Sequence, residues 1–263
     1  MGCHCALRFY VGDPLPSLLD SLLHYTELLQ AYGQPTMRLF LDPLIQACLY
    51  LTGRGGADLL VSNEKEPIRQ QTESWQDHMY LWVLLSKLHI AVYMNELEFA
   101  GRGLAAELRN SKLELVLPYA CKFKYFYDGI IAAIMSQRSR ICRWRARKRL
   151  KYLQKSALRC PENTANKVFF LEAELAASAG QYDRASLEYE KAIEYARKEH
   201  YLSEEALACE RLARMCLSLG NTSEATKYFS TAIKLYQRWG AKVKTDQLRE
   251  LCKREKLHLE IDF

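Results

Sequence analysis

Residues that interrupt helices are scarce in this sequence, which has seven prolines and twelve glycines among 263 residues. Strand signals are also nearly absent, because the one short candidate, LELVL at 113–117, is ended by Pro118. Since 49% of the residues are hydrophobic and 26% are charged, the chain can bury a large core and is not disordered. The sequence therefore predicts an all-α protein of one or two domains.

Long apolar runs and secretion signals are missing as well. The longest apolar stretches, 79–94 and 129–135, are interrupted or too short for the roughly 18–20 residues of a membrane span. His4, Arg8 and Asp13 break any signal-peptide pattern at the start. The nine cysteines, an odd number without a CxxC pair, predict reduced thiols rather than a disulfide framework. We therefore expect a cytoplasmic chain without a transmembrane segment.

Catalytic and ligand-binding motifs are also lacking. GRGG at 53–56 has neither the GK[ST] ending nor the preceding strand of a phosphate loop, and is predicted to be a turn. The histidines are isolated, with no HExxH motif and no neighbouring Ser or Cys nucleophile motif. The sequence thus predicts no enzyme activity, no catalytic residue, no cofactor and no metal.

The first residues, MGCHC, leave two minor alternatives. Gly2 and Cys3 are placed as in a lipid anchor, but Ala6 stands where the myristoylation pattern has Ser or Thr. Cys3, His4 and Cys5 could bind a metal, but they are too close in sequence to complete a tetrahedral site alone.

The sequence does contain a pattern that recurs after 40 residues, in 167–200 and again in 207–240. Its matched positions are Ala173 with Ala213, Gly180 with Gly220, Ala185 with Ala225, Tyr189 with Phe229, and Ala192 with Ala232. A fixed period of this size is typical of stacked helix pairs. Such chains usually act by presenting a surface to a partner.

These repeated positions have a physical interpretation as one helix pair. The Gly ends the first helix in the left-handed conformation, the alanines allow close helix approach, and the aromatic ring fills the groove between them. Asn221 is expected to cap the last paired helix, with Glu224 as its reciprocal partner. Residues 161–164 are expected to form the turn into the first repeat.

The series Gly180, Ala185, Tyr189 and Ala192 resembles the second half of the tetratricopeptide repeat, whose period is about 34 residues. The first-helix Trp of that family and its Pro near the end of the unit are both absent. Because the period is about six residues longer, we expect one helix or connector to be extended. The resemblance implies a right-handed superhelical solenoid of antiparallel helix pairs.

Longer stretches are similar to the helical region that follows the nucleotide-binding module in multidomain signalling ATPases of the AAA/STAND type. They are HYTELLQAYGQPTMRLFLDPLIQACLYLTG at 24–53, RKRLKYLQKSALRCPENTANKVFFLEAELAASAG within 141–180, and KLYQRWGAKVKTDQLR at 234–249. The most specific match is RWGAK at 238–242. The resemblance implies a protein–protein interaction or regulatory scaffold, either a segment of such a protein or a stand-alone paralogue, which links neighbouring domains or holds a partner in its concave groove. A non-catalytic fragment of an ATPase or kinase enzyme is the alternative.

The pattern divides the chain into a divergent helical-repeat region, 1–137, and a tetratricopeptide-like region, 138–263, closed by a capping helix. The predicted helices lie at about 13–33, 37–52, 70–97, 104–110, 119–136, 138–158 and 241–256, and the loop at 53–68 is the best connector. Pro43 either kinks the second helix or restarts it with Asp42 as its cap. One apolar stripe of the third comprises Trp75, Met79, Trp82 and Ser86.

Charge is concentrated in one helix, 138–155, which has nine basic residues and no acid. The nine exceed the net charge of +6, so the rest of the chain sums to −3. The possible interaction patch comprises Arg143, Arg145, Arg147, Lys148, Arg149 and Lys151. It would bind an acidic protein partner or, as the alternative, nucleic acid or an acidic membrane. We expect these charges to face water while Leu150 and Leu153 pack inward.

Acidic residues of the repeats are expected at solvated positions or in first turns, where they favour the helix dipole. They are Glu188, Glu190, Glu194, Glu204 and Glu205.

Overall fold

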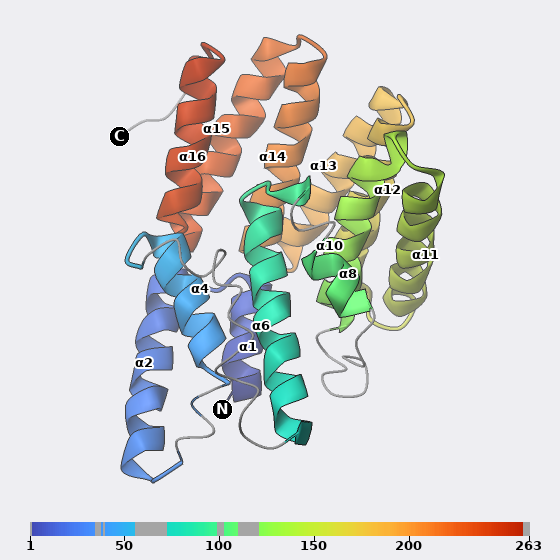
Figure 1. Ribbon diagram of the computed structural model, residues 1–263. Helices are drawn as coiled ribbons and strands as arrows, with labels where there is room; N and C mark the ends of the chain where they lie inside the picture. Colours follow the sequence, from blue (N-terminus) through green and yellow to red (C-terminus); the bar gives the residue numbers. More distant parts are fainter. Residues whose placement is uncertain are drawn as a thin grey trace. The chain divides into compact units, whose positions relative to one another are not determined.

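The computed structural model of the chain, shown in Figure 1, describes residues 2–34, 38, 40–55, 73–98, 103–109 and 121–259. For residues 2, 3 and 73–79 only the backbone is described. The described residues form twelve α-helices and one short 3-10 helix, and no strand occurs among them. The predicted all-α fold class is therefore confirmed for this part of the chain.

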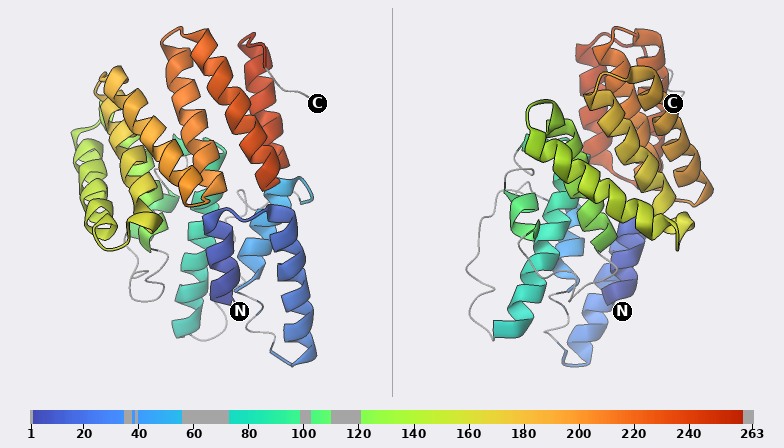
Figure 2. Two further views of the ribbon diagram at one scale, coloured as in Figure 1. Left: turned by 180° about the vertical axis from the view of Figure 1, so that it is seen from behind. Right: turned by 90° about the vertical axis from the view of Figure 1, so that its right-hand side faces the viewer.

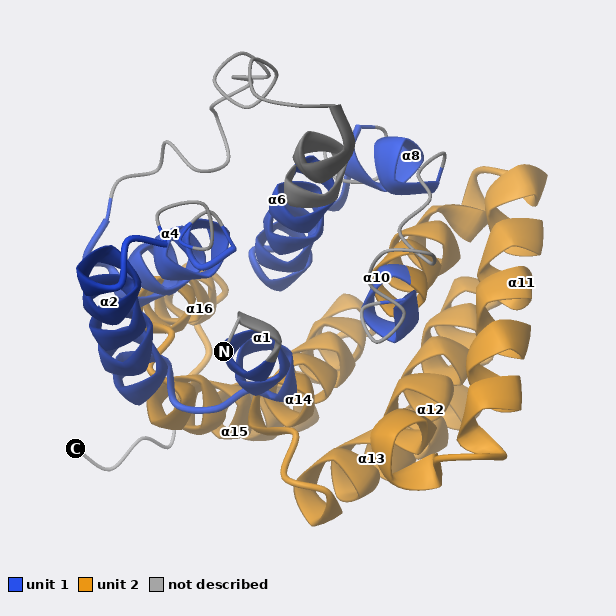
Figure 3. Cartoon of the chain, turned by 90° about the horizontal axis from the view of Figure 1, so that it is seen from below, with its two compact units in different colours: residues 1–124 blue, residues 125–263 orange. Residues whose placement is uncertain are grey.

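The chain divides into two compact units, which Figure 3 shows in different colours. Unit 1 comprises residues 1–124 and unit 2 residues 125–263, so the division falls inside helix α10 (Cys121–Ile134). The sequence pattern, by comparison, begins its regular repeats after residue 137.

The described residues of unit 1 contain five complete helices. They are α1 (Gly2–Val11), α2 (Leu15–Ala31), α4 (Asp42–Thr52), α6 (Glu73–Tyr93) and α8 (Leu104–Arg109). Successive helices of this series are in contact with each other. The predicted helices at 13–33, 37–52, 70–97 and 104–110 are all present, although α4 and α6 are shorter than expected.

Prolines and glycines set the helix ends of unit 1. Pro16 lies in the first turn of α2, and Gly33 follows its end with a positive φ of 63°. Pro43 lies in the first turn of α4, so this proline starts the helix instead of kinking a longer one. Asp42 is the first helical residue and not the cap, and Gly53 ends the helix in the left-handed conformation.

Some predictions concern residues outside the described part of the chain. These are the strand candidate at 113–117, most of the loop at 53–68, and the side chains of Trp75 and Met79. The other two members of that stripe, Trp82 and Ser86, are buried in α6.

The core of unit 1 contains an aromatic cluster around His89. Its ring centroid lies 4.6 Å from that of Phe9, 5.5 Å from that of Tyr10 and 4.5 Å from that of Tyr93. The imidazole is fully buried, and this burial lowers the pKa of His89 to about 3. His89 is therefore a neutral ring of the core at physiological pH.

The remaining helices belong to unit 2 and follow one another closely. After α10 come the 3-10 segment Met135–Gln137, α11 (Arg140–Ala157), α12 (Pro161–Ser178), α13 (Tyr182–Lys198), α14 (Leu202–Ser218), α15 (Thr222–Trp239) and α16 (Lys242–Arg254). From α11 onward each helix contacts the next one, and Figure 2 shows this succession from two sides.

Four turns between these helices share one geometry. Their positive-φ residues are Gly180 at 74°, His200 at 62°, Gly220 at 78° and Gly240 at 87°. In each turn this residue donates its N–H to the carbonyl three residues earlier, and the next residue donates to the carbonyl five residues earlier. This is the Schellman arrangement, which satisfies the last carbonyls of a helix. The chain therefore turns in the same way every twenty residues.

The 40-residue period has a simple structural origin. Helices α12 to α15 have 18, 17, 17 and 18 residues, so each helix with its turn occupies twenty. The expectation that a single helix or connector is extended is wrong, because the two helices of each pair differ in length by only one residue.

The repeated small and aromatic residues lie in the core of unit 2. The six alanines at 173, 185, 192, 213, 225 and 232 are at most 2% exposed. Tyr189 and Phe229 are buried between them, and the Tyr189 ring meets the Phe170 ring edge to face at 5.8 Å. Close helix contact at these positions requires small side chains.

Two local predictions in this region need correction. Pro161 is the first residue of α12 and not part of a turn, since a proline at that position loses no helical hydrogen bond. Asn221 does cap α15, with its Oδ1 accepting from the Glu224 N–H at 3.2 Å. The reciprocal bond does not form, because the Asn221 N–H donates to the Cys216 carbonyl within the Schellman turn.

Candidate functional site

Helix α11 carries the basic run and is amphipathic. The Ser139 hydroxyl caps it by accepting from the Cys142 N–H at 3.3 Å. The inner side packs Cys142, Ala146 and Leu153, which are buried, while Leu150 is half-buried. The predicted inward stripe is therefore present, and the basic residues are distributed over the remaining sides.

Two arginines of the predicted patch face inward. The Arg149 Nε lies 2.6 Å from one carboxylate oxygen of Asp128 on α10, and the Arg145 Nε lies 3.5 Å from the other. These arginine side chains are 14% and 15% exposed, and that of Asp128 is 2% exposed. Arg149 also lies over the Tyr125 ring at 4.5 Å. The expectation that all patch charges face water is wrong for these two, which anchor α11 to α10.

The other four patch residues are exposed. Arg143 donates to the Ser136 carbonyl at 3.3 Å, and Lys148 lies 5.1 Å from the centroid of the Trp144 ring. Arg147 and Lys151 are also exposed. Trp144 itself is 63% exposed and Ile141 is 73% exposed, so large apolar side chains accompany the cations.

A second constellation links alternate helices of unit 2, and the name cross-helix ladder is used for its three ion pairs. Lys167 of α12 pairs with Glu204 of α14 at 2.8 Å, and Glu174 of α12 with Arg211 of α14 at 2.6 Å. Glu210 of α14 pairs with Lys244 of α16 at 2.8 Å. The Arg211–Glu174 contact is a two-bond fork, because the Arg211 Nη2 also donates to the carboxylate at 3.1 Å.

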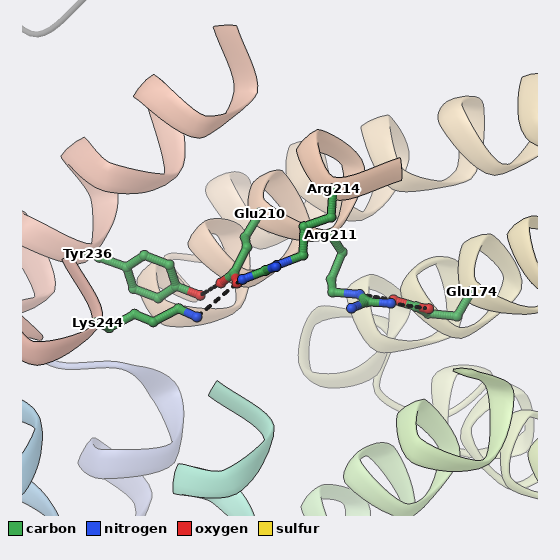
Figure 4. A network of polar contacts seen from close by, with 6 residues as sticks. All are labelled: Glu174, Glu210, Arg211, Arg214, Tyr236 and Lys244. Atoms are coloured by element: carbon green, nitrogen blue, oxygen red, sulfur yellow. Dashed lines mark hydrogen bonds and ion pairs between the residues drawn. The ribbon is translucent and has the colours of Figure 1, made fainter. Parts of the chain in front are cut away.

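Glu210 is the centre of the network in Figure 4. Its carboxylate accepts from the Lys244 ammonium at 2.8 Å, from Arg214 at 2.9 Å and from the Tyr236 hydroxyl at 2.9 Å. Burial alone would raise the pKa of Glu210, but Lys244 and Arg214 lower it below its usual value. Glu210 is therefore ionised at neutral pH.

The pKa values of the ladder cations shift in different directions. Burial lowers the pKa of Lys244 to about 8, although Glu210 opposes the shift. Burial also lowers the pKa of Lys167, against the effect of Glu204. For Arg211, burial works against the charge, but the neighbouring Glu174 raises its pKa. At neutral pH, Lys244 is mostly protonated and Arg211 is protonated beside their carboxylates.

The ladder corrects the expectation that the acids of the repeats are solvated. Glu204 and Glu205 do lie in the first turn of α14, but they are 3% and 6% exposed. Glu188 is 8% exposed, while Glu190 and Glu194 are exposed as expected. Glu204 is buried because it meets Lys167, and Glu205 because it meets Arg197 at 2.8 Å.

One sequence signal could have revealed the ladder. Lys167 and Glu174 are seven residues apart on one helix, and Glu204 and Arg211 are seven apart on a later helix with the charges reversed. Residues seven apart share a helix face, so opposite charges at equal spacing indicate two facing rows.

Helix α14, which contributes one residue to each ion pair of the ladder, has little exposed surface. From Leu202 to Leu217 of α14, every residue is buried or half-buried. The exposed large hydrophobic residues of unit 2 lie on other helices or at turns. They are Ile141, Trp144, Tyr152, Leu158, Tyr182, Leu187 and Leu219.

Other sequence candidates are distributed without forming a cluster. Within the described residues no group of three His, Cys, Asp or Glu side chains could hold a metal ion, and no helix could cross a membrane. Cys5 is buried, and this burial raises the pKa of its thiol, while the Cys3 side chain lies outside the described part. The eight described cysteines are all free thiols, and Cys160 alone among them is exposed.

Comparisons of this chain with protein-family profiles, with curated proteins and with solved structures give no match. The geometry of the helices and the chemistry of their surfaces therefore carry the functional interpretation.

Proposed function

We propose that this chain is a protein–protein interaction or regulatory scaffold. In this proposal, helices α12 to α16 form a tetratricopeptide-like, right-handed superhelical solenoid of antiparallel helix pairs. The observation that carries it is the identical turn every twenty residues, which repeats one helix-turn unit along the chain. Repeated units of this kind present extended surfaces, and binding to such a surface needs no reactive group.

The cross-helix ladder supports a rigid array. Charged pairs with nearly zero exposure hold their helices in one register, because breaking such a pair would leave a buried charge uncompensated. A partner then meets a preorganised surface, and preorganisation lowers the entropic cost of binding.

The partner is placed on exposed helix faces in this proposal. A concave groove lined by α14 is disfavoured, because no residue between Leu202 and Leu217 is exposed. The exposed faces of α11, α13 and α15 remain for a protein partner or for neighbouring domains of a longer polypeptide.

A second candidate function is a basic adaptor for nucleic acid or an acidic membrane through residues 138–155. The exposed cations of α11 favour it. Arg145 and Arg149 weaken it, since both are occupied by Asp128 and cannot contact phosphates as α11 stands.

The relation to signalling ATPases is also a proposal, and it rests on the sequence similarity centred on RWGAK at 238–242. An open reading frame upstream of Met1 that encodes GxxxxGK[ST] would support the interpretation as a segment of such a protein.

The scaffold proposal is tested by titration. The purified chain is immobilised, the proteins it retains from its own cells are identified, and each is titrated individually against the free chain. We expect at least one protein to bind saturably with defined stoichiometry. If none does so, or if the chain alone turns over a nucleotide substrate, the scaffold proposal fails.

A further inference from the structure

One side of α11 combines exposed cations with large exposed apolar side chains. It is called the α11 outer face, and it consists of Arg140, Ile141, Trp144, Arg147, Lys148, Lys151, Lys155 and Leu158. Steps of three and four residues connect Ile141 to Lys155, so these side chains form one stripe. At a rise of 1.5 Å per residue, the stripe from Ile141 to Lys155 is about 21 Å long.

Within the described residues, the cations of the α11 outer face have no acidic partner in an ion pair. In the described part of the chain, no carboxylate pairs with Arg140, Arg147, Lys148, Lys151 or Lys155. Like charges three and four residues apart on one helix face repel each other. The face is therefore an arrangement that an acidic partner would stabilise.

Lysines on the other helices of unit 2 show the contrast. Lys191 of α13 pairs with Glu188, Lys227 of α15 with Glu224, and Lys242 of α16 with Asp246, each on its own helix. Each of these three helices contains acids that pair with some of its surface cations, whereas the sequence of α11 contains no acid. The lack of any carboxylate on its own helix thus distinguishes α11 from α13, α15 and α16.

Large apolar side chains lie among these cations. Ile141 is 73% exposed, Trp144 is 63% exposed and Leu158 is 86% exposed. Trp is strongly enriched among the residues that dominate protein–protein binding energy. Isoleucine and leucine side chains have no charge or hydrogen-bond donor for a phosphate backbone, but they pack against apolar side chains of a peptide. The combination favours a protein segment over a nucleic acid.

We propose that the α11 outer face binds an acidic, amphipathic helical segment of a partner protein. The carboxylates of that segment would meet Lys148, Lys151 and Lys155, and its apolar residues would cover Ile141 and Trp144. The inference rests on the proposed scaffold function, and it names the surface and the chemistry of the partner.

The test uses a defined probe, a labelled helical peptide of about 18 residues, the length of α11. It carries glutamates along one stripe and Leu and Phe at the N-terminal and C-terminal ends of the same stripe. A comparison peptide has the same composition, with Leu and Phe moved to the opposite side. Binding is measured by fluorescence anisotropy at about 0.15 M salt, where surface charge alone is screened beyond about 8 Å. A single-stranded DNA oligonucleotide and phosphatidylcholine–phosphatidylserine vesicles are titrated in parallel.

Two variants remove the two parts of the face separately. One is Trp144→Ser and the other combines Lys148→Glu, Lys151→Glu and Lys155→Glu. The matched control combines Lys227→Glu, Lys234→Glu and Lys242→Glu, which changes the net charge equally on α15 and α16. Thermal unfolding confirms that each variant is folded, and Trp144→Ser tests the face without any change in charge.

We expect the probe to bind at least about tenfold more tightly than the comparison peptide, and each α11 variant to lose about tenfold or more. The control should retain the affinity of the unaltered chain. Equal binding of both peptides, equal loss in the control, or tighter binding of DNA or vesicles than of the probe would overturn the inference.

Titrating the protein partner identified for the scaffold against the α11 variants tests the two proposals separately. If that partner binds both α11 variants with unchanged affinity, the α11 assignment fails and the scaffold function stands. If the unaltered chain has no saturable protein partner, the scaffold function itself fails.

Discussion

The buried carboxylate of Glu210 is stabilised by three hydrogen-bond donors. Glu210 receives one hydrogen bond each from a lysine, an arginine and a tyrosine, and its side chain is 1% exposed. Three donors replace the water that an exposed carboxylate would hold, which is why the ionised form persists.

Replacing Glu210 with Gln should destabilise unit 2 by about 3–5 kcal/mol, because Lys244 then stays buried without a counter-charge. Denaturant unfolding measures the loss. The double variant Glu210→Gln with Lys244→Met should recover much of it, since the uncompensated charge is gone. As a control, Glu224→Gln breaks an exposed pair with Lys227 and should change stability by about 1 kcal/mol or less. Equal effects of the two single substitutions would contradict the buried network.

His89 should make stability depend on pH. Its pKa is lowered to about 3 in the folded chain, against 6.5 for an ordinary histidine. As the pH is lowered, the unfolded chain therefore takes up a proton at His89 before the folded chain does. The contribution of neutral His89 to the free energy of unfolding is fully present above about pH 6.5 and is lost as the pH falls toward 3. The loss should approach about 1.4 kcal/mol per pH unit in that window.

The effect of His89 is isolated by the His89→Phe variant, whose ring can remain among Phe9, Tyr10 and Tyr93. Unfolding free energies of both proteins are compared at pH 7, 6 and 5, above the range where Glu210 protonates. The difference between pH 7 and 5 should be smaller in the variant. Parallel curves would show that His89 does not titrate as a buried neutral ring.

At the scale of the helix, the twenty-residue unit depends on small residues at crossings. Ala185 and Ala225 have no exposed surface, and Tyr189 and Phe229 lie one turn further along the same helices. Packing at this density tolerates little change in volume.

Ala185→Leu or Ala225→Leu should cost about 1–3 kcal/mol through overpacking. Tyr189→Ala or Phe229→Ala should cost about 3–5 kcal/mol because each leaves a cavity. Leu187→Ala on the exposed side of α13 is the control and should stay within about 0.5 kcal/mol. Denaturation midpoints give the comparison, and unchanged midpoints in all four core variants would refute the packing scheme.

Helix α11 has two roles on two sides. Arg145 and Arg149 hold Asp128, while Arg147 and Lys148 face solvent. Replacing Arg145 and Arg149 together with Gln should therefore lower the unfolding temperature, because the buried Asp128 carboxylate loses its ion pairs with both arginines. Replacing Arg147 and Lys148 with Gln should leave the unfolding temperature nearly unchanged. Thermal melts of both double variants decide the point, and an equal shift would contradict this division.

At the scale of the whole molecule, the sequence has no phosphate-binding loop and the proposed role is binding. We expect the purified chain to show no ATP turnover and no ATP-induced thermal shift. Saturable micromolar ATP binding that a point substitution abolishes would contradict the proposal. A measured salt dependence of DNA binding would also be informative, since each phosphate contact contributes about one log unit per log unit of salt.

The sequence alone predicted what depends on local chemistry. Gly180 and Gly220 end helices through their backbone preference, Asn221 caps α15 through its side chain, and alanine spacing indicated the packed sides. For Pro43 the sequence left open whether it kinks a helix or starts one, and the structure shows that it starts α4. His200 escaped prediction, because a left-handed histidine has no signature in composition although it stands 40 residues before Gly240. The Asp128 pairs escaped because they join residues 17 and 21 apart on different helices, where spacing along one helix does not decide contact. The ladder joins residues 34 to 37 apart, and its one trace in the sequence is the matched seven-residue spacing of opposite charges on α12 and α14.

The ladder also bears on how such a chain can evolve and melt. In a row of helices coupled only to their neighbours, the terminal helix can fray alone. Here the bonds run from α12 to α14 and from α14 to α16, so each one braces across an intervening helix. Local unfolding of α16 would break the Glu210–Lys244 pair and so weaken α14, which favours unfolding of these helices in a single step. Inserting a single helix would place a helix without ladder residues where a helix with them is needed. Units should therefore be gained or lost two helices at a time.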